Sequence, residues 1–130
     1  MNRTCMQAAL TDLLLTPNLE LHDAVERHFT PNYRQRTDGQ WNTREEFVEH
    51  IAHLRTIVAT CTIEIHDEHC DGIHYADRHT VDVTKTDGST ALIEVYAFGE
   101  FAPDGRFNRI EEATLMLRGT ESDQNLGNAR

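Results

Sequence analysis

The chain has 130 residues, which is enough for one domain with a single hydrophobic core. Its formal net charge of −10, from 22 acidic and 12 basic residues, repels phosphate backbones, so we expect no nucleic-acid partner. Residues 1–5 lack the apolar core of a secretion signal, and no apolar run approaches the roughly 20 residues that cross a bilayer, so we expect a cytoplasmic protein with no membrane contact.

Three amphipathic helices are predicted in the first half of the chain. The first spans residues 3–15, where apolar side chains recur with helical period, namely Met6, Leu10, Leu13 and Leu14. A Thr-Pro pair at residues 16–17 ends it and starts the second helix, because threonine can cap a helix and proline fits the first helical position. A second Thr-Pro pair, at residues 30–31, ends that helix. The third begins at a capping box formed by Thr43 and Glu46.

A polar stretch, residues 33–42, separates the second and third predicted helices. It contains an Asp-Gly pair at residues 38–39 and the only tryptophan, Trp41. Because a loop with aromatic ends can surround a ligand, we expect this stretch to form the mouth of a pocket.

After residue 59 the apolar side chains follow the period of two that is typical of β-strands. Asp-Gly pairs at residues 71–72, 87–88 and 104–105 separate strand-like runs, and such pairs favour tight hairpins. The sequence therefore predicts four antiparallel strands in up-and-down order, with a bulge at Gly99 that bends the sheet. We expect residues 119–130 to be a polar flexible tail.

The last two predicted strands, residues 90–101 and 107–117, are apolar on both faces. One face of the sheet packs on the helices, and no segment of this chain remains to cover the other. We therefore expect a homodimer formed through the sheet face. The alternative is a monomer with an exposed, half-apolar sheet.

The order of these elements resembles the nuclear transport factor 2-like superfamily, and most closely its SnoaL-like branch. The resemblance covers residues 3–118 and includes Tyr-x-Gln at residues 33–35 and Asp-Gly-Arg-Phe at residues 104–107. It implies one α+β domain, residues 1–118, in which three N-terminal helices pack on a strongly bent four-stranded antiparallel sheet. This cone encloses a pocket for a small apolar or amphipathic molecule. Members include isomerases, cyclases, epoxide hydrolases and dehydratases, so the resemblance leaves the reaction open.

Glu112 is the first candidate catalytic residue. The resemblance implies a pocket-side carboxylate on the last strand in several catalytic branches, and Glu112 shares a strand face with Ile110, Thr114 and Met116. A carboxylate among such neighbours has a raised pKa and could act as a general acid or base. The alternative is a solvated glutamate at the rim of the cone.

The second predicted strand supplies the other catalytic candidates. Resemblance to the epoxide-hydrolase branch implies a group of Arg78, Asp82 and Glu112, although the spacing from arginine to aspartate differs from that branch. Arg78 and Asp82 could instead form an exposed ion pair. His79, on the opposite strand face, is a further candidate for proton transfer.

Substrate contacts are expected at Tyr33, Gln35, Arg36, Trp41 and Tyr96. The first two lie near the Tyr and Asn of the epoxide-hydrolase branch. Arg36 lies near the general base of the ketosteroid isomerases, where an arginine cannot act as a base but could bind an anionic group. Alternatively, the aromatic side chains could fill the cone and leave no room for a ligand.

The eight histidines and three cysteines match no metal-binding spacing, so we expect surface histidines, reduced thiols, no metal and no cofactor. Three functions remain open. The chain could be an acid–base enzyme centred on Glu112, a non-catalytic ligand-binding protein, or a dimeric accessory protein. Convergence of two titratable groups in the pocket would favour the enzyme.

Overall fold

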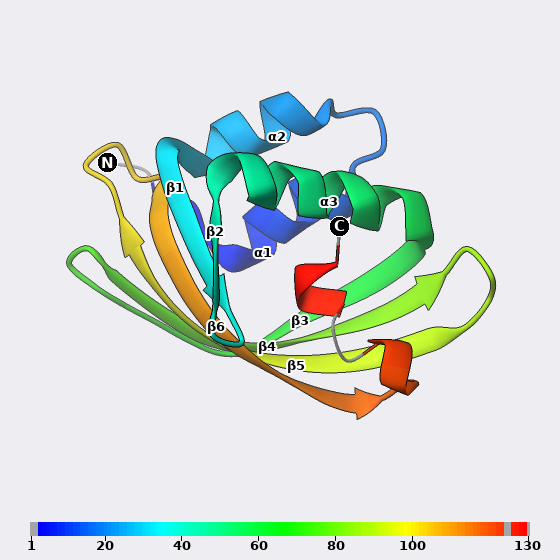
Figure 1. The fold of residues 1–130 in the computed structure, drawn as a ribbon. Helices are drawn as coiled ribbons and strands as arrows, with labels where there is room; N and C mark the ends of the chain where they lie inside the picture. The colour runs from blue at the N-terminus through cyan, green and yellow to red at the C-terminus, as the bar shows by residue number, and fades with distance from the viewer. Residues whose placement is uncertain (1–2, 124–125, 130) are drawn as a thin grey trace.

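The computed structural model describes residues 3–123 and 126–129. Within these residues a six-stranded sheet, in the order β2-β1-β6-β5-β4-β3, curls around the helices, which lie against its concave face (Figure 1). The strands are β1 (Phe29–Thr37), β2 (Gln40–Thr43), β3 (Val58–Asp71), β4 (His74–Lys85), β5 (Thr90–Phe101) and β6 (Phe107–Arg118). The helices are α1 (Met6–Leu10), a π-helical turn η1 (Thr11–Leu15), α2 (Leu21–His28), α3 (Arg44–Ile57), and the short 3₁₀ helices η2 (Glu121–Asp123) and η3 (Leu126–Asn128).

The helical predictions hold for the first and third helices better than for the second. Residues 6–15 are helical, and the Thr43–Glu46 capping box is present at the start of α3. The second helix does not begin at Pro17 but at Leu21, and it ends at His28. No helix of the described residues is long and apolar enough to cross a membrane.

The prediction of four strands was wrong, because residues 29–43 form two further strands. β1 pairs antiparallel with β2 and parallel with β6, so α3 follows two strands and the helices are not all N-terminal. The side chains of Tyr33, Gln35 and Thr37 are buried while Arg34 and Arg36 are exposed. Two of the three buried side chains are polar, so the apolar alternation that identifies a strand is missing from the sequence.

The predicted meander is present in strands β3 to β6, each of which pairs antiparallel with the next. The predicted bulge is not at Gly99, which pairs regularly with Tyr75 and Ile110; the nearest register shift leaves Asn108 of β6 unpaired opposite Glu100 and Phe101. A Cβ at Gly99 would lie 3.2 Å from the backbone oxygen of Arg109, so close approach of the two strands explains the glycine.

Aromatic side chains pack together in the core. Ring centroids lie 4.5 Å apart for Phe29 and Tyr33, 4.9 Å for Phe29 and Phe47, and 5.2 Å for Tyr75 and Phe107. These side chains come from three strands and α3, so one cluster ties the sheet to the helices. The leucines of α1 and η1 line the interior together with Phe29 and Phe47 of this cluster.

Candidate functional site

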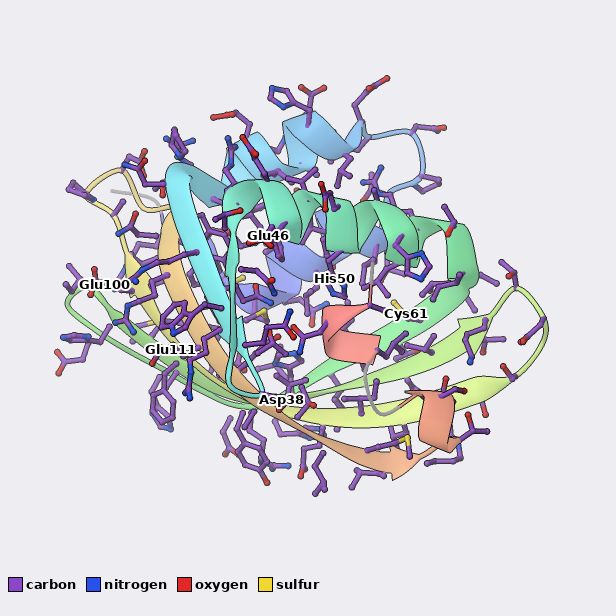
Figure 2. All side chains as sticks on the ribbon, viewed as in Figure 1. Asp38, Glu46, His50, Cys61, Glu100 and Glu111 are labelled. Atoms are coloured by element: carbon purple, nitrogen blue, oxygen red, sulfur yellow. The ribbon has the colours of Figure 1, made fainter. Side chains whose placement is uncertain are left out.

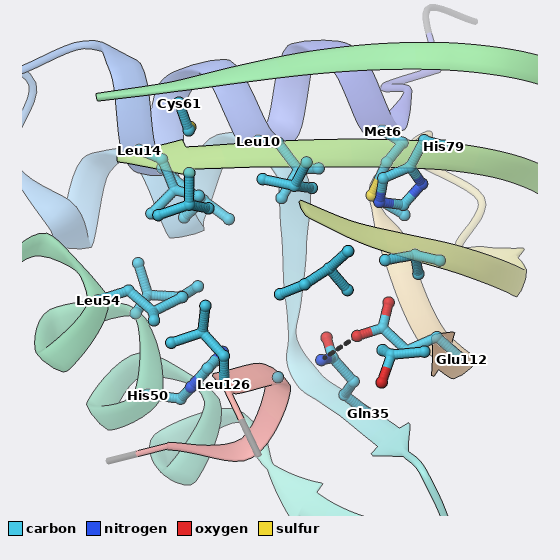
Figure 3. A pocket seen from close by; sticks show the side chains of 18 of the residues that line it. Met6, Leu10, Leu14, Gln35, His50, Leu54, Cys61, His79, Glu112 and Leu126 are labelled. Carbon is cyan, nitrogen blue, oxygen red and sulfur yellow. Dashed lines mark hydrogen bonds between the residues drawn. The ribbon is translucent and has the colours of Figure 1, made fainter. Parts of the chain in front are cut away.

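A cavity of about 120 Å³ lies between the concave face of the sheet and the helices (Figure 3). Most of its lining is apolar, with Leu10, Leu54, Val95 and Leu126 among the contributors. Four titratable side chains also line it, namely His50, Cys61, His79 and Glu112. The site is therefore a small apolar chamber with a few polar groups, which is the common form of a small-molecule site.

Glu112 projects from β6 into this cavity. Its carboxylate oxygen Oε1 accepts hydrogen bonds from Gln35 Nε2 at 3.2 Å and from Thr37 Oγ1 at 3.1 Å. Within the described residues both recorded bonds end on Oε1, which leaves Oε2 as the oxygen for a ligand. Figure 3 shows the carboxylate beside Gln35 at the edge of the cavity.

Burial raises the pKa of the Glu112 carboxyl above its ordinary range, because desolvation disfavours the charged form. Attraction to His79 and the hydrogen bond from Thr37 act in the opposite direction but do not cancel this effect. A carboxyl with a raised pKa is a stronger base when ionised and a usable acid when protonated.

Tyr33 and Gln35 orient the groups around Glu112. The buried Tyr33 hydroxyl donates to Gln35 Oε1 at 2.5 Å, which fixes the amide so that its Nε2 faces Thr37 and Glu112. Burial, together with the negative charge of Glu112, raises the pKa of Tyr33 well above its ordinary value. Tyr33 therefore stays protonated and remains a donor.

The hairpin between β1 and β2 is fastened to β6 next to Glu112. Asp38, at the hairpin tip in Figure 2, has a φ of 50° and its carboxylate accepts hydrogen bonds from the Thr114 backbone N–H and hydroxyl. The Asp38 backbone N–H donates to the Glu112 carbonyl at 3.0 Å. These bonds hold the strand that carries Glu112 in register with Gln35 and Thr37.

His79 reaches the same cavity from β4. Its Nδ1 and Asp77 Oδ1 lie 2.7 Å apart, and the other oxygen of Asp77 accepts a hydrogen bond from the Tyr75 hydroxyl at 2.8 Å. Because an ionised carboxylate only accepts hydrogen bonds, Asp77 favours the tautomer of His79 with hydrogen on Nδ1. The ring nitrogen Nε2 is then the one left for a ligand.

The sheet register places the two carboxylates in one row. Asp77 pairs with Ala97 in β5, and Ala97 pairs with Glu112 in β6. In the adjacent row Val95 lies between His79 and Thr114. His79 and Glu112 both line the cavity from the concave face of the sheet, on strands that β5 separates (Figure 3).

Arg78 and Asp82 are not part of this pocket, contrary to the predicted catalytic group. They lie on the outer face of the sheet, because alternate residues of β4 point to opposite sides. Arg78 pairs with Asp67 at 3.0 Å and Glu94 at 3.1 Å. Asp82 pairs with Arg118 at 2.7 Å. The arrangement required for an epoxide-hydrolase site is therefore absent at these positions.

The residues expected to contact substrate divide in the same way. Gln35 lines the cavity and Tyr33 supports it from behind. Arg36, Trp41 and Tyr96 are exposed and do not line the cavity. One alternative required aromatic side chains to fill the cone. Trp41 and Tyr96 do not fill it, because both rings are exposed. Trp41 packs against the Arg34 guanidinium, and the Tyr96 hydroxyl donates to Glu94.

Sequence reasoning did not assign roles to Thr37, Asp77, His50 or Leu126. Asp77 had a usable signal, because it lies two residues before His79 and so shares its strand face. Thr37 had none, because its strand was not recognised. Leu126 stood alone in a polar stretch that was predicted to be flexible. No group of three or more metal-binding side chains occurs within residues 3–123 and 126–129.

Comparisons with known proteins agree with this architecture. Residues 11–110 match the family model of the SnoaL-like domain. The chain is 32% identical over 108 residues to the uncharacterized protein C11D3.04c of Schizosaccharomyces pombe, covering 83% of this chain and 82% of that protein.

Solved structures with low sequence identity show the same fold. A nuclear transport factor 2-like protein of unknown function from Exiguobacterium sp. 255-15 superposes with a TM-score of 0.71 at 13% identity, covering 86% of this chain and 98% of that one. AclR of Streptomyces galilaeus, a candidate hydroxylase, gives a TM-score of 0.68 at 14% identity, with coverages of 95% and 85%. The fold is that of nuclear transport factor 2-like proteins, and the chain belongs to the SnoaL-like family.

Proposed function

We propose that this protein is a cofactor-independent acid–base enzyme that moves a proton on a small, mostly apolar organic molecule. The observation that carries the proposal is the Glu112 carboxylate, which has a raised pKa and shares an apolar cavity with His79. Two titratable groups that face one cavity can divide proton removal and proton delivery between them.

In this proposal the ionised Glu112 removes a proton from the substrate through Oε2. Gln35 and Thr37 hold Oε1 and keep the carboxylate aimed at the cavity. When His79 carries hydrogen on both ring nitrogens, Nδ1 donates to Asp77 and Nε2 donates to the substrate oxygen on which negative charge develops. Asp77 acts as a positioning residue, because it orients the imidazole through Nδ1.

The relatives do not identify which reaction this protein catalyses. AclR is a candidate hydroxylase, and a structural neighbour from Agrobacterium tumefaciens is a candidate isomerase of the SnoaL-like family. One fold therefore serves different chemistries, and the choice must come from the site. A carboxylate and an imidazole that line one apolar cavity favour an isomerase or cyclase that works through proton abstraction beside a carbonyl.

The test is incorporation of deuterium from D₂O into a panel of ketones that can enolise, beginning with cyclohexanone, followed by NMR. Glu112→Gln keeps the size and the hydrogen-bond acceptor but cannot take up a proton, so exchange should fall by about 100-fold or more. Glu111→Gln is the matched control, because Glu111 pairs with Arg109 and does not line the cavity. It should leave exchange unchanged.

The second candidate is a ligand-binding protein without catalysis, and the apolar lining of the cavity favours it. In that case a ketone would bind, but Glu112→Gln would leave the slow exchange at the level of the wild-type chain. Equal exchange rates in the wild-type chain, Glu112→Gln and the solution without protein would refute the enzyme.

A further inference from the structure

The C-terminal segment, residues 126–129, forms part of the cavity wall. Leu126 is 8% exposed and lines the cavity together with Gly127. Figure 3 shows Leu126 beside His50 and Leu54 of α3, on the side of the cavity away from His79. In Figure 1 the same segment stands between α3 and the sheet.

Hydrogen bonds hold this segment in place from both sides. His50 Nδ1 donates to the carbonyl oxygen of Ala129. The Asn128 side chain donates to the Thr37 carbonyl at 3.0 Å and accepts a hydrogen bond from Asn42 at 3.4 Å. The segment is therefore bound to α3 on one side and to the β1–β2 hairpin on the other.

Gly127 sits against Thr37, the side chain that donates a hydrogen bond to Glu112. A Cβ at Gly127 would lie 3.1 Å from Thr37 Cγ2, so the glycine lets the segment approach this closely. Thr37 thus lies between Gly127 and the candidate base, Glu112. Asp123, which precedes the segment, is buried and pairs with Lys85 at the end of β4 at 2.5 Å. This ion pair also fixes the chain to the sheet.

We propose that Leu126, held by these contacts, sets the size of the molecule that the pocket accepts. This inference concerns the pocket of the proposed function, although it requires binding rather than catalysis. The cavity with the segment in place is about 120 Å³. An apolar cavity of roughly 150 Å³ in another protein holds benzene. The expected ligand is therefore a compound with a single ring and one oxygen for Glu112 or His79, and a ligand with two fused rings must displace the segment.

The test is isothermal titration calorimetry on the full chain with two ketones, cyclohexanone and 2-decalone, which has two fused rings. The wild-type chain should bind cyclohexanone more tightly than 2-decalone by about tenfold or more, because the second ring collides with Leu126. In Leu126→Ala, affinity for 2-decalone should rise about fivefold or more, while affinity for cyclohexanone changes little.

Two further variants keep the test decisive. Leu115→Ala is the matched control, because it removes the same side chain from an exposed position outside the cavity, and both affinities should stay unchanged. Leu126→Phe adds volume and should weaken binding of cyclohexanone. A smaller side chain at position 126 should strengthen binding of 2-decalone, and a larger one should weaken binding of cyclohexanone. A general loss of stability would instead weaken binding in both variants.

Equal changes for both ketones in Leu126→Ala, or no binding of either ketone to any of these chains while they remain folded, would overturn the inference. The proposed function is tested separately by exchange in Glu112→Gln. A chain in which Leu126 controls ligand size but Glu112 has no effect on exchange would keep the size limit and refute the enzyme.

Discussion

Ionising Glu112 inside the cavity should cost stability, and the cost should depend on pH. Because the pKa is raised in the folded chain, the folded state keeps this proton to higher pH than the unfolded state does. The cost is absent below the ordinary carboxyl pKa, where both states are protonated. It grows as the pH rises toward the pKa in the folded chain, and above that pKa it is constant.

Glu112→Gln should therefore raise the free energy of unfolding at neutral pH relative to the wild-type chain. The gain should shrink as the pH falls toward the ordinary carboxyl range, because glutamine keeps the hydrogen-bond acceptor but has no charge to bury. Urea unfolding followed by circular dichroism over a series of pH values measures this. A gain that is the same at every pH would show that the charge of Glu112 is not the cause.

Arg55 of α3 joins elements that are distant in the sequence. Its guanidinium donates to the carbonyl oxygens of Leu13 at 2.7 Å, Leu19 at 3.0 Å and Asp12 at 3.2 Å. Those carbonyls lie in η1 and in the connection to α2, where the helix leaves acceptors without intrahelical partners. One side chain thus fixes the segment that forms a wall of the cavity.

Arg55→Ala should lower the free energy of unfolding by about 2 kcal/mol. The variant loses hydrogen bonds from a charged donor and leaves partly buried carbonyl oxygens without this partner. Arg36→Ala is the control, since Arg36 is exposed, and its effect should be small. Chemical denaturation of the two variants gives the comparison. Equal stabilities would mean that solvent replaces the contacts of Arg55 without loss.

The meander of β3 to β6 could be predicted because its signals are local. Asp-Gly pairs mark the turns, and alternation marks the strands. β1 was not predicted although Asp38-Gly39 marks its turn to β2, because its buried face carries Gln35 and Thr37 and its other partner, β6, lies about 75 residues further along the chain. The polar side chains that concealed the strand are the ones that bind Glu112. The candidate site was thus the place where the local pattern failed.

The candidate site, like the sheet, could be predicted only in part from the sequence. The resemblance implied a pocket-side carboxylate at Glu112, and alternation put His79 on the strand face opposite Arg78 and Asp82; the structure locates both Glu112 and His79 at the cavity. The same alternation sends Arg78 and Asp82 to the outer face, so the predicted group mixed two sides of one sheet. The contribution of Leu126 depends on how the C-terminal segment folds back, and a single leucine in a polar stretch carries no periodic signal.

At the scale of the whole molecule, the outer face of the sheet is the surface expected to join two copies. Four large apolar side chains are exposed there on β5 and β6, namely Tyr96, Phe98, Leu115 and Leu117. Charges of both signs lie among them, including Arg78 with Glu94 and Arg109 with Glu111. A face with both charges can meet its own copy without net repulsion.

Phe98→Glu should therefore convert a dimer of this chain into a monomer, because Phe98 is the most exposed of these side chains at 67%. Size-exclusion chromatography with light scattering measures the mass directly. His22→Glu places the same charge on an exposed position of α2, on the helical side of the sheet, and should leave the dimer intact. A wild-type chain that remains monomeric at high concentration would contradict the prediction.

The central claim is that Glu112 transfers the proton, and the pH profile of deuterium exchange into a bound ketone tests it most directly. The rate at limiting ketone concentration should rise with pH as Glu112 ionises, through a pKa raised above the ordinary carboxyl value of 4.5. Glu112→Gln should lose this rise, and Glu111→Gln should keep it. A profile that is flat, or one that survives in Glu112→Gln, would show that another group, or none, is the base.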